Sequence, residues 1–298
     1  MDDSELDPSA FDGAPVRVAD LQSVIGHLQR GDCCSLVGPS NLGKSHLLKT
    51  VVKRRSPWRR ALEGTGVLIA LVDCLPATDN VGPVVENKRI FVTKVISELI
   101  HELDAESEAP PEMTLRALQA FLDQAQRNSF QDTPSVLIML LEKAIQEALW
   151  SPERSLILVL DEFDDVLGKE RGTHLFNTLR TLRNRYAERF RLVVATVRPV
   201  DTLYGVDVCD EFVEMFKGQT CYLQPLTAAD ARAYAGFLAR VRRTDPDDGL
   251  AELLFELSGG HPALMGCLHR HRRSVPTGHS SMTRLMDRML ARDDVEDE

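Results

Sequence analysis

The chain has 298 residues, of which 45 are acidic and 35 are basic, giving a formal net charge of −10 at pH 7. Its apolar content of 43% is ordinary for a globular protein, and its length fits one large domain or a core domain with a smaller one. No apolar run reaches the ~18 residues of a membrane helix, the start of the chain is acidic and unlike a secretory signal, and the six cysteines show no metal-ligand spacing. We therefore expect a cytoplasmic protein with reduced cysteines and no membrane partner, and the acidic charge argues against a general nucleic-acid coat.

Residues 1–14 are predicted to form an acidic tail, and Val18 to Gln29 an amphipathic helix. The most informative segment follows, and it reads Gly38-Pro39-Ser40-Asn41-Leu42-Gly43-Lys44-Ser45. This matches G-x-x-x-x-G-K-[ST], the loop that wraps the phosphates of a nucleotide. An apolar run over residues 33–37 predicts a strand before it, and apolar residues at helical spacing over 47–52 predict a helix after it, which is the context that the motif requires.

The chemistry of this loop explains its residue types. Glycines allow successive backbone N–H groups to point at the phosphates, and the positive end of the following helix dipole faces the same anion. Lys44 is expected to reach the β- and γ-phosphates, and the Ser45 hydroxyl to ligate Mg²⁺. His46 comes next and is counted with the nucleotide-contacting segment, although we expect its side chain to pack on the helix.

Five cations and a tryptophan lie in the segment from Lys53 to Arg60. Such a segment can grip nucleic-acid phosphates or stack a base, but an exposed connector is the favoured interpretation. A second buried strand is predicted over 67–72. Helices are then predicted over 90–103, 115–125 and 136–149. Asp161 follows Lys44 by 117 positions. One crossover helix needs far fewer, which predicts a helical elaboration at about 87–150.

Residues 155–160 are a run of aliphatics that predicts a strand buried on both faces, as in a parallel sheet covered by helices. The run ends in Asp161 and Glu162, at the edge where open α/β sheets bind ligands. Asp161 is predicted to hold Mg²⁺, and Glu162 to orient and polarise the attacking water. For Asp164 and Asp165, a functional role and a simple turn role are equally favoured.

A helical stripe over 175–186 and strands over 192–196 and 221–223 complete a five-stranded α/β core. For Arg185 and Arg189, on and after that stripe, a solvated helix face is the favoured interpretation. From Thr227 the pattern becomes wholly helical. We predict a three-layer core over 15–224, a small all-helical lid over 225–291 and an acidic tail over 292–298.

Four segments together resemble the AAA+ and STAND branches of the P-loop ATPases over roughly residues 15–290. They are Gly38 to Ser45, residues 158–164, residues 195–199 and the lid segment 257–264. The resemblance implies that Thr196 and Arg198 read the γ-phosphate, and that Pro262 and His261 sense the nucleotide from the lid. It also implies that Arg185 and Arg189 lie in the region from which AAA+ proteins project an arginine into a neighbour's site. A proline in this lid motif, where typical AAA+ proteins carry an arginine, favours the STAND branch.

The resemblance implies an ATP-binding, slowly hydrolysing switch that couples nucleotide state to lid movement and to a protein partner or a homo-oligomer. ATP and Mg²⁺ are the expected ligands. An AAA+ regulator that oligomerises on DNA, of the transposition or replication-initiation type, is the alternative from another class. A nucleotide sensor without turnover is a third possibility.

Overall fold

The structure is a computed structural model, and it describes residues 16–54, 56–62, 66–75, 84–106, 110–127, 134–164, 166, 174–203, 210–243 and 248–270. The predicted tails at 1–14 and 292–298, and the end of the predicted lid after residue 270, lie outside the described residues. Within this part of the chain, no helix is long and apolar enough to cross a membrane.

Two compact units divide the chain, one over 18–224 and one that joins the first residues to those from Pro225 onward. The described residues of the larger unit form five strands, at Cys34–Val37 (β1), Val67–Asp73 (β2), Ser155–Asp161 (β3), Phe190–Thr196 (β4) and Thr220–Tyr222 (β5). All pairs are parallel and the strand order is β2-β3-β4-β1-β5. The predicted five-stranded parallel sheet is therefore confirmed.

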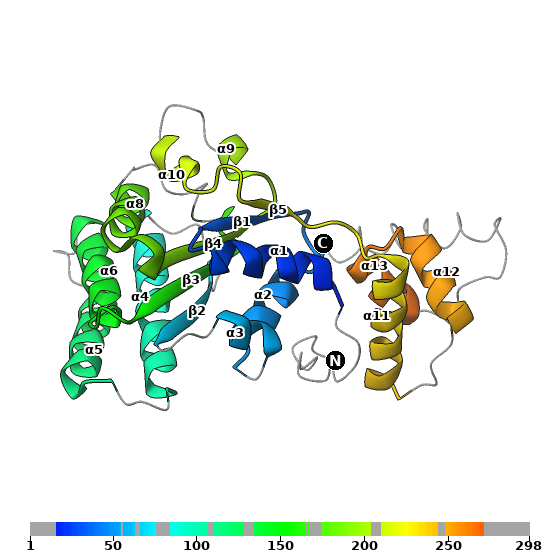
Figure 1. The fold of residues 1–298 in the computed structure, drawn as a ribbon, viewed down its shortest axis with the longest axis horizontal. Helices are drawn as coiled ribbons and strands as arrows, with labels where there is room; N and C mark the ends of the chain where they lie inside the picture. Colours follow the sequence, from blue (N-terminus) through cyan, green and yellow to red (C-terminus); the bar gives the residue numbers. More distant parts are fainter. Residues whose placement is uncertain are drawn as a thin grey trace, which may run out of the picture. The chain divides into compact units, whose positions relative to one another are not determined.

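The helices of the larger unit alternate with these strands (Figure 1). They are Val18–Gln29 (α1), Lys44–Val52 (α2), Pro57–Leu62 (α3), Val84–Asp104 (α4), Glu112–Gln126 (α5), Pro134–Ala148 (α6), His174–Tyr186 (α8), Val200–Leu203 (α9) and Asp210–Glu214 (α10), with a 3-10 turn at Ala187–Arg189 (η3).

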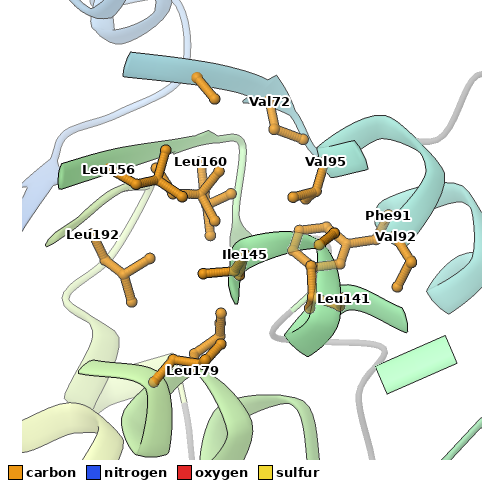
Figure 2. Packing of buried hydrophobic residues seen from close by; sticks show 14 of the residues in the cluster. Val72, Phe91, Val92, Val95, Leu141, Ile145, Leu156, Leu160, Leu179 and Leu192 are labelled. Carbon is orange, nitrogen blue, oxygen red and sulfur yellow. The ribbon is translucent and has the colours of Figure 1, made fainter. Parts of the chain in front are cut away.

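Side-chain alternation along the strands explains the three layers. In β3, Ile157 and Val159 face the cluster that contains α1 and α2, while Leu156, Leu158 and Leu160 face the cluster that contains α4, α6 and α8. Figure 2 shows this second cluster, with Leu156 and Leu160 of β3 on one side and Val95 of α4 and Ile145 of α6 across from them. Because both faces of the sheet are buried, every residue of a strand can be apolar, and continuous apolar runs therefore allowed the strands to be predicted from the sequence.

The smaller unit contains the helices Ala228–Val241 (α11), Asp248–Ser258 (α12) and Pro262–Arg270 (α13), packed around Leu254 and Met265. Val16 packs on this cluster, and the backbone N–H of Arg17 donates to Asp230 at 2.8 Å. The turn between α12 and α13 requires Gly260, because a Cβ there would lie 2.4 Å from the Leu226 carbonyl oxygen.

Candidate functional site

The glycine-rich loop lies between β1 and α2, as its motif predicts. Gly38 is buried, and its N–H donates to the Thr196 carbonyl at 3.1 Å. Leu42, which is 3% exposed, packs into the core and anchors the loop from within. Pro39, Ser40 and Asn41 are exposed. The loop is thus held in place at Gly38 and Leu42, and the three residues between them are exposed.

The end of this loop delivers a buried cation to the start of α2. Gly43 has φ 98°, a left-handed conformation that glycine adopts without steric cost. Lys44 is 3% exposed, and its Nζ donates to the carbonyls of Gly38 at 2.7 Å and Pro39 at 3.2 Å. The ammonium therefore lies inside the curve of the loop, where a bound phosphate would meet it.

The first turn of α2 is suited to an anion. No side chain of the described residues caps this helix, and no acidic residue lies in its first turn. Among the described residues, no backbone acceptor bonds the N–H groups of Gly43, Lys44 or Ser45. Unpaired N–H groups and the helix dipole favour an anion at this position. His46 is exposed on the same helix.

The acidic end of β3 meets this loop at the carboxyl edge of the sheet. Asp161 is 5% exposed, and its carboxylate accepts hydrogen bonds from the Ser45 hydroxyl and from the Glu162 N–H, the latter at 3.0 Å. Burial raises the pKa of Asp161, which the hydrogen bond from Ser45 counters in part. A hydroxyl and a carboxylate in contact are oxygen ligands of the type that Mg²⁺ prefers.

Glu162 occupies a strained turn directly after the strand. Its φ is 50°, an uncommon conformation for a residue with a side chain and one that often marks functional sites. Burial raises the pKa of its carboxyl; Lys44 opposes the shift, and Asp161, Asp164 and Asp73 add to it. A carboxylate with a raised pKa is a better proton acceptor near neutral pH.

Thr196 and Arg198 lie at the end of β4, which the sheet order places between β3 and β1. Thr196 is fully buried, and its Oγ1 has no hydrogen-bond partner among the described residues. A buried hydroxyl without a partner costs free energy unless a ligand or water satisfies it. Arg198 is exposed after the strand.

Asp161 also leads to a prediction about the apo protein. Because burial raises its pKa, ionised Asp161 lowers stability above that raised pKa, whereas below the ordinary pKa of Asp it is protonated in both states and has no such cost. We expect Asp161→Asn, without Mg²⁺ or nucleotide, to raise Tm at pH 8 by about 2–4 °C, which corresponds to about 1 kcal/mol. The gain should shrink as the pH falls toward 4. Thermal unfolding from pH 4 to 8, with Asp201→Asn as an exposed control, tests this, and a variant less stable at every pH would contradict it.

Pro262 is the first residue of α13 in the smaller unit and is half-buried. The preceding residue, His261, helps to cap that helix, because its Nδ1 accepts from the Leu264 N–H at 3.5 Å and its carbonyl from the Met265 N–H at 2.9 Å. These contacts give His261 a local structural role. A role for either residue toward the nucleotide stays a proposal.

The basic segment at residues 53–60 differs from the predicted connector. Residues from Pro57 onward form α3, and Arg59 is 6% exposed, with its guanidinium donating to Glu102 of α4 at 2.8 Å and to the Val52 carbonyl at 2.8 Å. Arg54 also pairs with Glu102, at 3.4 Å. Two of these cations therefore join the end of α2 to α4. Lys53 and Arg60 stay exposed.

Removing Glu102 should be costly, because it would break the buried ion pair between Glu102 and Arg59. We expect Glu102→Ala to lower the free energy of unfolding by about 3 kcal/mol or more, as for other broken buried ion pairs. Glu112→Ala is the matched control, since Glu112 pairs with Arg116 on an exposed face (78% and 76%) and its loss should cost less than about 1 kcal/mol. Urea unfolding compares the two, and equal effects would contradict a buried pair.

Two further arginines are bound within the chain. Arg189 donates to the carbonyls of Arg154 at 2.8 Å and Leu149 at 3.0 Å, so the expectation of a solvated side chain is wrong for it. Arg185 is half-exposed and pairs with Glu142 at 3.3 Å. The geometry therefore gives Arg189 a structural role in this chain.

Two acidic residues near the site were not selected as candidates. Asp73 ends β2 and pairs in register with Asp161, and Lys94 of α4 donates to the Asp73 carbonyl at 2.8 Å. The position of Asp73 at the end of a predicted buried strand was a sequence signal by which it could have been selected as a site candidate. Asp164, left between two roles, accepts a hydrogen bond from the Val197 N–H.

The strand order and the C-terminal helices define an α/β fold of the kind found in AAA+ P-loop ATPases with their lids. No protein-family model and no curated protein matches the chain. Solved structures do match. The Aeropyrum pernix ORC2 protein, in ADPNP and ADP complexes, has a TM-score of 0.55 at 16% identity, over 93% of this chain and 64% of that one. The Walker-type ATPase of Pyrococcus abyssi has a TM-score of 0.54 at 16% identity, over 97% and 79%.

A third structure, the Aeropyrum pernix ORC1 protein in complex with DNA, has a TM-score of 0.55 at 17% identity, over 95% of this chain and 68% of that one. At these identities the likeness shows the fold alone, and the chain spans less than two thirds of the ORC2 protein. The likeness of fold does not distinguish the STAND branch from other P-loop ATPases, so the STAND assignment stays a proposal.

Proposed function

We propose that this chain binds Mg²⁺–ATP at the loop between β1 and α2 and hydrolyses it. The observation that carries the proposal is the convergence of three groups at one edge of the sheet. Lys44 lies inside the loop, the Ser45 hydroxyl bonds the Asp161 carboxylate, and Thr196 offers a buried hydroxyl that has no partner within the described part of the chain. Cation, metal ligands and a free donor are the groups that a triphosphate needs.

The donor set fits Mg²⁺, because Ser45 and Asp161 supply the hydroxyl and carboxylate oxygens that hold it in this class of site. When bound, the ion would neutralise charge on the β- and γ-phosphate oxygens. Lys44 would bind the same oxygens through its ammonium, and the N–H groups at the start of α2 would donate to them.

Glu162 would act on the attacking water. Its carboxylate accepts a proton from the water as the new bond from the water oxygen to the γ-phosphorus forms and the bond from that phosphorus to the β-bridging oxygen breaks. Thr196 and Arg198 would donate to the γ-phosphate oxygens as charge develops on them. ADP lacks the γ-phosphate, so these two residues would distinguish ATP from ADP.

Such differential contacts allow nucleotide state to control assembly, since a ligand shifts an equilibrium only through contacts that differ between the two states. A DNA-binding ATPase regulator is the first candidate for the output, because the ORC1 likeness extends over 95% of this chain and that protein was solved with DNA. A STAND-type switch with a protein partner is the second candidate, favoured by the segment Gly259 to Pro262.

Mass photometry with ADP or with a slowly hydrolysed ATP analogue, each with and without duplex DNA, tests the output. A DNA regulator should form larger, salt-sensitive complexes on DNA with the analogue, and Lys53→Ala/Arg60→Ala should weaken them several-fold. Lys143→Ala/Lys217→Ala is the charge-matched control. Assembly without DNA would favour the switch, and unchanged mass in both nucleotides would leave an ATPase without this output.

A further inference from the structure

The chain leaving β4 is held by three consecutive hydrogen bonds. The Ala195 carbonyl accepts from the Phe163 N–H at 2.9 Å, and the Thr196 carbonyl accepts from the Gly38 N–H at 3.1 Å. The Val197 N–H then donates to both carboxylate oxygens of Asp164, at 2.9 and 3.0 Å. The turn that carries Thr196 and Arg198 is thus bound on one side to the end of β3 and on the other to the phosphate loop.

Only the last of these three bonds depends on a side chain. Asp164 lies three residues after Asp161, where the backbones of β3 and β4 no longer pair. Its carboxylate accepts the hydrogen bond that a backbone carbonyl of β3 would accept if the pairing of β3 with β4 went one step further. A charge-assisted bond to a backbone N–H is stronger than a neutral one, and it can be removed by substitution without touching the main-chain bonds.

The backbone before Asp164 is held in place by aromatic packing. The preceding residue, Phe163, is fully buried and packs edge-on against Phe176, with ring centroids 6.3 Å apart, and against Phe212 at the same distance. This packing fixes the backbone on which Asp164 stands. Val197, by contrast, is 38% exposed, so packing of its own side chain contributes less to its position.

We propose that Asp164 is a positioning residue for ATP hydrolysis, a role that rests on the ATPase function proposed above. By holding the Val197 N–H, it sets the direction in which Thr196 and Arg198 meet the γ-phosphate. A displacement of ~1 Å at such groups can cost ~10²-fold in rate. Loss of the bond should therefore weaken recognition of the triphosphate and leave the diphosphate unaffected.

The charge of Asp164 has a second, smaller effect. It is one of the groups that raise the pKa of Glu162, after burial and the Asp161 charge. Asp164→Asn keeps one oxygen that can accept from Val197 and removes the charge, whereas Asp164→Ala removes both. The two variants therefore separate the hydrogen bond from the electrostatic contribution.

Amide hydrogen exchange on the apo protein tests the contact itself. We expect the Val197 amide to exchange about tenfold faster or more in Asp164→Ala, because a protected N–H becomes free, and at close to the wild-type rate in Asp164→Asn. Asp201→Ala, an exposed acid four positions beyond Val197, is the control. Unchanged exchange at Val197 in Asp164→Ala would overturn the proposal.

Nucleotide preference tests the role. With Mg²⁺, Asp164→Ala should bind an ATP analogue about tenfold more weakly and ADP equally well, and kcat should fall by about 10–100-fold. In a protein that already carries Arg198→Ala and Thr196→Val, adding Asp164→Ala should cause little further loss of ATP-analogue affinity or of kcat, as expected for coupled groups. Equal weakening of both nucleotides, or a full loss in the triple variant, would sink the positioning role.

These outcomes separate the two proposals. A wild type that binds neither nucleotide contradicts the ATPase function, and the positioning role with it. A wild type that binds both nucleotides, with a preference that Asp164→Ala leaves unchanged, contradicts the positioning role alone.

Discussion

Lys44→Ala should abolish measurable ATP binding, with an affinity roughly 30–3,000-fold below that of the wild type. Lys44 is 3% exposed and lies within hydrogen-bond reach of the Gly38 and Pro39 carbonyls, inside the loop. Its removal would take a desolvated cation away from the phosphates, and truncating one partner of such a charged contact costs about 2–5 kcal/mol. At 1.4 kcal/mol for each tenfold change, this is roughly 30–3,000-fold in Kd. Calorimetry with Mg²⁺ and a slowly hydrolysed ATP analogue measures it.

Lys49→Ala is the matched control, because Lys49 lies on the same helix and is exposed. It should change the affinity by less than about threefold. Thermal unfolding of both variants shows whether the fold is kept. Equal affinity of the wild type and of Lys44→Ala for the ATP analogue would contradict the assignment of a phosphate site to this loop.

Glu162→Gln should keep ATP bound and lower turnover by about 10²–10⁴-fold, the range for a lost general base. The amide has nearly the same shape as the carboxylate and cannot take the proton of the attacking water. In the wild type, the raised pKa of Glu162 implies that turnover falls as the pH is lowered through that pKa, because the protonated carboxyl no longer accepts a proton. Phosphate release at saturating ATP, followed between pH 5 and 8, measures both effects.

Glu153→Gln is a suitable control and should leave kcat unchanged. Glu153 is exposed and precedes the first residue of β3, whereas Glu162 follows the last. Wild-type turnover in Glu162→Gln would show that another group activates the water. Binding without turnover in the wild type would instead favour a nucleotide sensor.

The sheet and the phosphate loop could be predicted because their signals are local. β3 is a continuous aliphatic run, predicted over 155–160 and found at Ser155–Asp161, and α1 was predicted at its observed bounds. The G-x-x-x-x-G-K-[ST] motif placed Lys44 at the start of a helix, where it lies. The reach of α4 was underestimated: it begins at Val84, six residues before the predicted start.

What could not be predicted depends on partners that are distant in sequence. Arg59 looked like a surface cation, and its carboxylate partner Glu102 lies 43 positions away. Asp164 looked equally like a turn residue, and its partner Val197 lies 33 positions away. No periodicity or propensity encodes such a pairing, because it arises only when the strand order brings the two segments together.

Single-turnover hydrolysis tests the central claim most directly. Purified protein, freed of nucleotide and in excess over γ-labelled ATP, should release labelled phosphate in one exponential phase that requires Mg²⁺. Lys44→Ala and Glu162→Gln should both lose this phase, the first because ATP does not bind and the second because bound ATP persists. The absence of released phosphate from the wild type with Mg²⁺, or equal release from all three proteins, would contradict the assignment of an ATPase site to this loop.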